Sequence, residues 1–149
     1  MAFLSSFDIS ASGMSAQRLR MDIASENIAN MDTTRTEGGG AYKRKLVSFQ
    51  SYETRSFQDV LKSARDGRGI ASRKAGVRVS AITEDDREMQ KVYNPEHPDA
   101  DEDGYVTLSN VDVLKETVDS MAAYRSYEAN VTALNAMKLM AQKALEIGR

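Results

Sequence analysis

Residues 109–147 read SNVDVLKETVDSMAAYRSYEANVTALNAMKLMAQKALEI, and this stretch decides the fold. Its apolar residues recur at helical spacing, which predicts one uninterrupted helix. Ser109 followed by Asp112 has the spacing of a capping box at the start, and Gly148 supplies a stop signal. Such a helix is about 55 Å long at about 1.5 Å per residue. It overhangs any core that a chain of 149 residues can build, so we expect other chains to complete that core.

The predicted C-terminal helix has two apolar faces. The first holds Tyr124, Tyr127, Val131, Leu134, Ala141 and Leu145. The second is made almost entirely of small side chains: Val118, Ala122, Ala129, Ala133, Ala136 and Met140. Small side chains let helix axes approach closely. One face can pack within the chain, which leaves the other for a neighbouring molecule.

A second amphipathic helix is predicted to begin near Ser5, where Asp8 completes a capping-box spacing, and to end near Asn30. It also has two apolar faces, whereas a surface helix of a monomer normally has one. We expect this helix to lie between two neighbours, one of which can be another molecule. The first face holds Ile9, Ala16, Leu19 and Ile23, and the second holds Phe3, Phe7, Met14, Met21 and Ile28.

The pattern changes between the two helices. Residues 42–49 and 77–82 are predicted to be strands, residues 57–64 a short helix, and residues 65–76 a mobile loop. Asp103-Gly104 is placed to turn a hairpin between residues 91–93 and 105–108. The predicted fold is therefore mainly α: long N- and C-terminal helices packed together, with a small β-rich (α+β) insert. The helical core domain takes residues 1–34 and 109–149, and the insert domain takes residues 35–108.

Composition excludes several classes of function. The chain has no cysteine, which excludes disulfides and thiolate metal sites. Its one histidine, His97, excludes multi-histidine zinc sites and any Ser-His-Asp triad that does not include His97. A net charge of −2 does not imply nucleic acid as a partner. No stretch approaches the roughly 18 apolar residues of a membrane span, and the N-terminus lacks the pattern of a cleaved secretory signal. We therefore expect no enzyme activity, no cofactor and no metal.

Two clusters of charge point to other chemistry only weakly. Asp99, Asp101 and Asp103 copy the first ligands of a calcium-binding loop, but position 12 is Asn110 and Pro98 breaks the entering helix. A calcium-binding module at residues 99–103 is therefore an alternative, with an acidic solvated turn as the simpler interpretation. Basic residues within 62–78 are not interleaved with aromatic side chains, which favours a solvated or partner-facing loop over a nucleic-acid site.

The ends of the chain carry a specific resemblance. ASGMSAQRLRMDIASENIAN at 11–30, continued by MDTT, resembles the N-terminal signature of bacterial flagellar rod and hook proteins. NVDVLKE at 110–116, YRSYEAN at 124–130 and ALEIG at 144–148 resemble the matching C-terminal signature. YNPEHPD at 93–99, GYV at 104–106 and VDVL at 111–114 are similar to the proximal-rod members in particular. Residues 65–76 match no part of that pattern.

This resemblance implies a structural subunit of the proximal rod of the flagellar basal body, which passes motor torque to the hook. The implied partners are copies of this chain, rod proteins of the FlgB, FlgF and FlgG types, FliE and the flagellar type III export gate. It implies a place in the rod within the periplasmic space, reached without a cleaved signal. An alternative is a helical adaptor or coiled-coil protein, although Arg125 and Lys138 interrupt a strict heptad.

If the chain assembles through its helices, the apolar faces are the candidate subunit interface. The candidate interface residues are Met14, Leu19, Met21, Ile23, Ile28, Val118, Ala122, Tyr124, Tyr127, Ala129, Val131, Ala133, Leu134, Ala136 and Met140.

Overall fold

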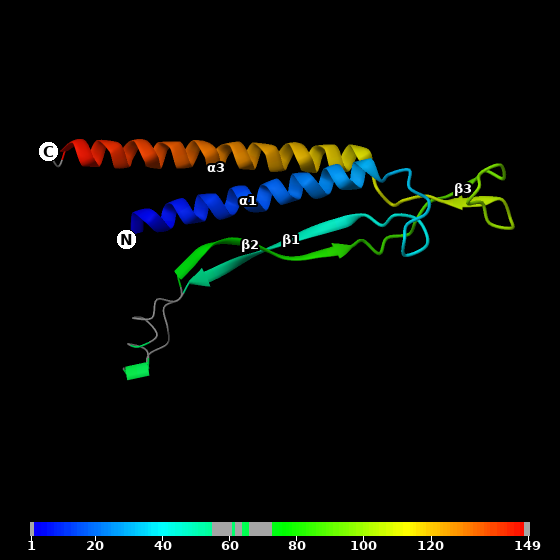
Figure 1. The fold of residues 1–149 in the computed structure, drawn as a ribbon, viewed down its shortest axis with the longest axis horizontal. Helices are drawn as coiled ribbons and strands as arrows, with labels where there is room; N and C mark the ends of the chain where they lie inside the picture. Colours follow the sequence, from blue (N-terminus) through cyan, green and yellow to red (C-terminus); the bar gives the residue numbers. More distant parts are fainter. Residues whose placement is uncertain (1, 55–60, 62–63, 66–72, 148–149) are drawn as a thin grey trace.

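The computed structural model describes the chain except residues 1, 55–60, 62–63, 66–72 and 148–149 (Figure 1). Two long helices run antiparallel and side by side: α1, Ala2–Ala29, and α3, Val113–Ile147. Between them in sequence lie β1, Lys45–Thr54, and β2, Arg73–Glu84, followed by the short strands β3, Lys91–Tyr93, and β4, Tyr105–Thr107. The predicted fold class, two terminal helices with a small β insert, is confirmed.

Helix α1 is the middle layer of the molecule. It packs against α3 on one side and against the antiparallel β1–β2 hairpin on the other (Figure 1). Ser12 and Gly13 illustrate the two sides, since the Ser12 hydroxyl accepts a hydrogen bond from Val77 N–H at 3.2 Å while Gly13 faces Asn130 of α3. The two neighbours expected from its two apolar faces are thus present. Both belong to the same chain, and they leave Met14, Met21 and Ile28 half-buried.

The N-terminal end of α3 differs from the prediction. The helix begins at Val113 rather than Ser109, and the Asp112 carboxylate caps it by accepting hydrogen bonds from Leu114 N–H at 3.0 Å and Lys115 N–H at 3.3 Å. Ser109 is buried before the helix, where its hydroxyl accepts from Val111 N–H at 3.4 Å. The Ser109 capping box was therefore wrong, because that hydroxyl stabilises a turn instead. Helix α1 likewise begins earlier than Ser5, at Ala2.

The sequence pattern predicted where the strands lie, but it did not predict their lengths. Strand β1 begins at Lys45, later than residue 42, and continues to Thr54. Strand β2 extends back to Arg73, so the mobile loop predicted for residues 65–76 was wrong at its last four residues. Most of that loop and most of the short helix predicted at 57–64 lie outside the described residues. Strands β3 and β4 pair as expected, although β4 ends at Thr107.

The buried core is small and made largely of small side chains. Its apolar members are Ala16, Ile23, Ala24, Ala41, Tyr42, Val106 and Ala123. Such a core holds the helices close together but leaves most of the surface of α3 in water. No helix among the described residues is long and apolar enough to cross a bilayer.

Candidate assembly surface and buried polar junction

The structure divides the candidate interface residues into two groups. The first group is wholly or partly covered within the chain. On α1, Ile23 is buried and Met14, Leu19, Met21 and Ile28 are half-buried. On α3, Tyr127, Val131 and Leu134 are half-buried. These residues already contribute to packing inside one molecule.

One contact shows which face of α3 points inward. The Arg18 guanidinium donates to the Tyr127 hydroxyl at 3.4 Å and lies 5.8 Å from the centre of its ring. Ala123, one turn earlier on α3, is completely buried. The face predicted from Tyr127, Val131 and Leu134 is therefore the intrachain face, except at Tyr124 and Leu145, which are 58% and 76% exposed.

The second group lies uncovered on the outer side of α3. It is the small-residue face, here called the outer stripe: Val118, Ala122, Ala129, Ala133, Ala136 and Met140. Val118 is 58% exposed and Met140 is 60% exposed. Positions spaced three, four and seven apart share one side of a helix, so the stripe is continuous along most of α3. A soluble monomer rarely exposes an apolar band of this kind, and such bands mark interaction sites.

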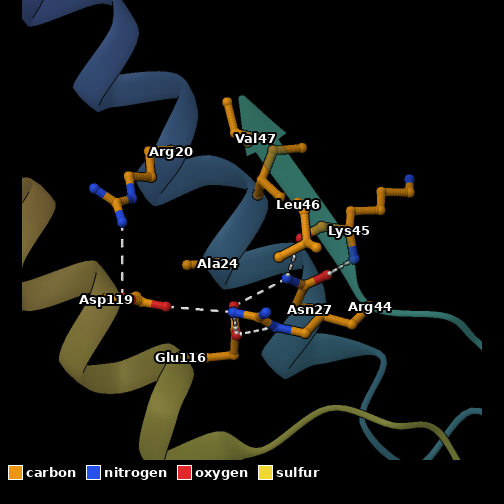
Figure 2. Close-up of a pocket in the computed structure, with 10 residues that line it drawn as sticks. Arg20, Ala24, Asn27, Arg44, Lys45, Leu46, Val47, Glu116 and Asp119 are labelled. Carbon is orange, nitrogen blue, oxygen red and sulfur yellow. Dashed lines mark hydrogen bonds and ion pairs between the residues drawn. The ribbon is translucent and has the colours of Figure 1, made fainter. Parts of the chain in front are cut away.

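A buried polar cluster joins the C-terminal end of α1 and the N-terminal end of α3 to the β1–β2 hairpin (Figure 2). Its centre is Arg44, which precedes β1 and is 6% exposed. Arg44 Nε donates to Glu116 Oε1 at 2.5 Å, and its Nη2 lies 3.3 Å from Asp119 Oδ2. Arg44 Nη1 lies 3.6 Å from Asp85 Oδ2. We call Asn27, Arg44, Asp85, Asn110, Glu116 and Asp119 the junction.

Asn27 connects three elements within the junction. Its side-chain N–H groups donate to Glu116 Oε2 at 2.9 Å and to the Lys45 carbonyl at 3.0 Å. Its side-chain oxygen accepts from Lys45 N–H at 2.9 Å and from the Tyr42 hydroxyl at 3.0 Å. The amide therefore uses both donors and both acceptor sites, so a side chain of another shape cannot replace it fully.

Ionisation in and near the junction is shifted by the same contacts. Burial, followed by the charges of Glu26, Glu116 and Glu84, raises the pKa of Tyr42 to about 12. Hydrogen bonds from the Arg87 side chain to Asp85, partly opposed by burial, lower the pKa of Asp85 to about 2. The Arg87 pKa is raised in turn by Asp85. Asp85 therefore stays ionised, as its two arginine neighbours require.

The junction positions elements and does not form a ligand site. It borders a cavity of about 70 Å³, well below the roughly 300 Å³ of a small-molecule pocket. Asn110 completes it by accepting from Arg44 N–H at 2.8 Å and donating to the Asp85 carbonyl at 2.9 Å. Arg20 lies 3.7 Å from Asp119, so that Asp119 has an arginine on each side, Arg20 and Arg44. The charged groups neutralise one another and fix where β1, β2 and both helices meet.

Sequence periodicity did not find the junction. Its residues come from five places in the chain, and Arg44 gives no local signal of its role. A partial signal exists on α3, where Glu116 occupies the position two turns before Ala123 on the inward face. A carboxylate at a position that should be apolar indicates a buried partner.

The acidic loop does not use its carboxylates as a calcium loop would. Asp99 accepts from the Thr34 hydroxyl at 2.8 Å and lies 3.8 Å from Arg35. Within the described part of the chain, no three acidic or histidine side chains come together in a metal-binding arrangement.

Comparison with known proteins points to one family. Residues 7–35 match the family model of the flagella basal body rod protein, and residues 102–147 match the C-terminal model of the flagellar basal body rod FlgEFG proteins. The flagellar basal-body rod protein FlgC of Bacillus subtilis is 53% identical over 97% of each chain. FlgC of Borreliella burgdorferi is 39% identical over 99% of this chain and 98% of its own, and FlgC of Salmonella typhimurium is 38% identical over the whole of both. The chain therefore belongs to the FlgC family of flagellar basal-body rod proteins, which are structural subunits of the flagellum.

Proposed function

We propose that this chain is a non-catalytic subunit of the proximal rod that joins its neighbours through the outer stripe of α3. The observation that carries the proposal is the exposure of that stripe in a molecule whose other helix, α1, is covered on two sides. Membership of the FlgC family indicates that the assembly is the flagellar rod. Neither a helical adaptor nor a calcium-binding module is favoured by the relatives, which are named as rod proteins.

The stripe gives the proposed assembly a physical mechanism. Covering apolar surface contributes about 25 cal/mol per Å², and alanines let a neighbouring helix approach closely. Repeated around a tube, such contacts make a stiff wall that can pass torque along its axis. The junction holds the helix pair and the hairpin at a fixed angle, so that load on one reaches the other.

The proposed neighbours are copies of this chain and rod proteins of the FlgB, FlgF and FlgG types. We also propose that the chain contacts FliE and the flagellar type III export gate, and that the assembled subunit lies in the periplasmic part of the basal body. The relatives, which are flagellar basal-body rod proteins, support the rod itself. The finer set of neighbours follows from the proximal-rod resemblance of residues 93–99 and 104–106.

Enlarging the stripe tests the proposal. Ala129→Leu and Ala133→Leu should stop motility when they replace the wild-type chain in a strain that lacks it. Overpacking a close helix contact costs about 1–3 kcal/mol at every repeated interface. Helix content of the isolated variants should equal that of the wild type, because both positions are exposed in the single molecule.

Asn135→Leu is the matched control, since it adds the same side chain to an exposed position of α3 outside the stripe. It should retain motility. Wild-type swimming by both alanine variants would remove the outer stripe from the interface.

A further inference from the structure

A hollow lies between α1 and α3 and is here called the flank hollow. Its volume is about 330 Å³. It is lined by Ala11, Met14, Ser15 and Arg18 of α1 and by Tyr127 of α3. The Arg18 guanidinium donates to the Tyr127 hydroxyl at 3.4 Å, so a hydrogen bond joins the two walls of the hollow. The flank hollow is therefore a built feature of the helix pair.

The flank hollow belongs to an apolar row on α1 that the hairpin does not cover. Met14, Met21 and Ile28 follow one another at seven-residue spacing and therefore share one side of the helix. All three are half-buried, so part of each side chain still faces water. Ser12, which accepts a hydrogen bond from β2, lies about 200° around α1 from Met14, at about 100° per residue. The hairpin consequently packs on the far side of α1 and leaves this row open to another molecule.

The flank hollow and the outer stripe lie on opposite flanks of the helix pair. Ala123 is completely buried and marks the side of α3 that faces α1. At about 100° per residue, Ala122 of the outer stripe and Tyr124 are turned in opposite senses from Ala123. Tyr127 of the hollow lies one turn beyond Tyr124 and on the same flank. One molecule therefore carries a row of small side chains on one flank and a hollow on the other.

The charges beside the two surfaces have opposite signs. The charged side chains within one or two turns on the same flank are Lys115 and Arg125 for the outer stripe, and Asp8 and Asp22 for the flank hollow. All four are exposed, and none makes an ion pair with another described residue. Arg18, the cation within the hollow, is held against the Tyr127 ring. Opposite signs favour contact between a stripe and a hollow, whereas two stripes would repel each other.

We infer that the flank hollow of one molecule receives the outer stripe of a second copy of this chain. The inference rests on the proposed function and names the surface that the stripe meets. A stripe that met a copy of itself would form a closed pair with no free stripe left. A stripe in a hollow leaves one free stripe and one free hollow, so the same contact can repeat around a tube. Alanines suit this contact because they let the second helix approach until Met14 and Tyr127 are covered.

Disulfide cross-linking in assembled basal bodies tests this contact. The chain has no cysteine, so the introduced thiols are the only ones that it carries. Ala11→Cys, exposed at the hollow, is combined in turn with Ala129→Cys, Ala133→Cys and Ala136→Cys, which lie about one turn apart along the exposed stripe. A disulfide forms only where the two Cα atoms come within about 7 Å, so the three pairs sample the axial offset between neighbouring copies. After oxidation with iodine, an immunoblot for this chain should show dimers, trimers and longer ladders for at least one pair.

Ala11→Cys with Asn135→Cys is the matched control, because Asn135 is exposed on the Tyr124 flank of α3 and not on the stripe. This control should give no ladder. Dimers from Ala133→Cys alone would show that a stripe meets a second stripe, and would overturn the inference. Absence of a ladder from all three pairs would overturn it as well. Protection of Ala129→Cys from maleimide in basal bodies reports separately on the proposed function, so protection without a ladder removes the hollow as the partner and leaves the rod role standing.

Discussion

At the scale of single residues, Arg44 has the most demanding environment in the molecule. It is nearly buried and lies within ion-pair distance of Asp85, Glu116 and Asp119. Removing such charges from water costs several kcal/mol each, so a buried network of this kind contributes more to a unique geometry than to net stability. Its value to this fold is that one side chain fixes the start of β1 against the first turn of α3.

Glu116→Ala should lower the free energy of unfolding by about 3 kcal/mol, because it leaves Arg44 and Asn27 without their shared partner in a buried site. Urea denaturation followed by circular dichroism measures the change. Glu128→Ala, on the exposed side of the same helix, should change it by less than about 0.5 kcal/mol. Equal effects of the two substitutions would mean that the junction does not hold the fold together.

The lowered pKa of Asp85 predicts a loss of stability in acid. A carboxyl whose folded pKa is about 2, against an ordinary 3.8, contributes stability that is fully present above about pH 4. That contribution is lost as the pH falls from about 4 through 2, because the folded state must then take up a proton that it binds poorly. Asp85→Asn should remove this part of the pH dependence of urea unfolding, whereas Asp86→Asn, at the exposed position next to it, should not. If the free energy of unfolding of Asp85→Asn fell between about pH 4 and pH 2 as much as that of the wild type, Asp85 would not be the group responsible.

At the scale of elements, periodicity identified both helices and the pairing of β3 with β4, since each element has a local pattern. It placed the start of α3 four residues early because Ser109 and Asp112 both look like caps, and only tertiary contacts decide between them. The predicted strand at residues 77–82 was shorter than β2 for a similar reason. Arg73 and Lys74 have no strand alternation, but they pair with Thr54 and Glu53 of β1.

Gly76 marks where the hairpin crosses α1 and predicts a specific defect. An added Cβ would lie 2.3 Å from the Ser12 hydroxyl and 3.1 Å from the Tyr52 ring, and the glycine φ is +148°. Gly76→Ala should therefore destabilise the fold by about 2 kcal/mol in thermal unfolding. Gly38→Ala, where nothing lies within 4 Å, should be close to neutral. Partial rescue of Gly76→Ala by Ser12→Gly would tie the loss to this contact, and a Gly76→Ala variant as stable as wild type would refute it.

At the scale of the whole molecule, the sequence predicted two apolar faces on each helix but could not say which face was internal. Met14 and Ala129 are equally plausible interface residues by spacing, yet the first is half-buried in one molecule and the second is exposed. Packing within the chain decides this difference, because Met14 lines a hollow together with Arg18 and with Tyr127 of α3. The junction was likewise beyond a local reading, since Arg44, Asn27 and Glu116 meet only after the chain has folded.

Chemical labelling of a single cysteine tests most directly whether the outer stripe is the assembly surface. The chain contains no cysteine, so Ala129→Cys introduces the only thiol, at a position exposed in the isolated molecule. Maleimide should modify this thiol rapidly in the isolated chain and slowly in purified basal bodies, while Ala123→Cys, completely buried, should react slowly in both. Equal, rapid labelling of Ala129→Cys in the isolated chain and in the assembled rod would contradict the account.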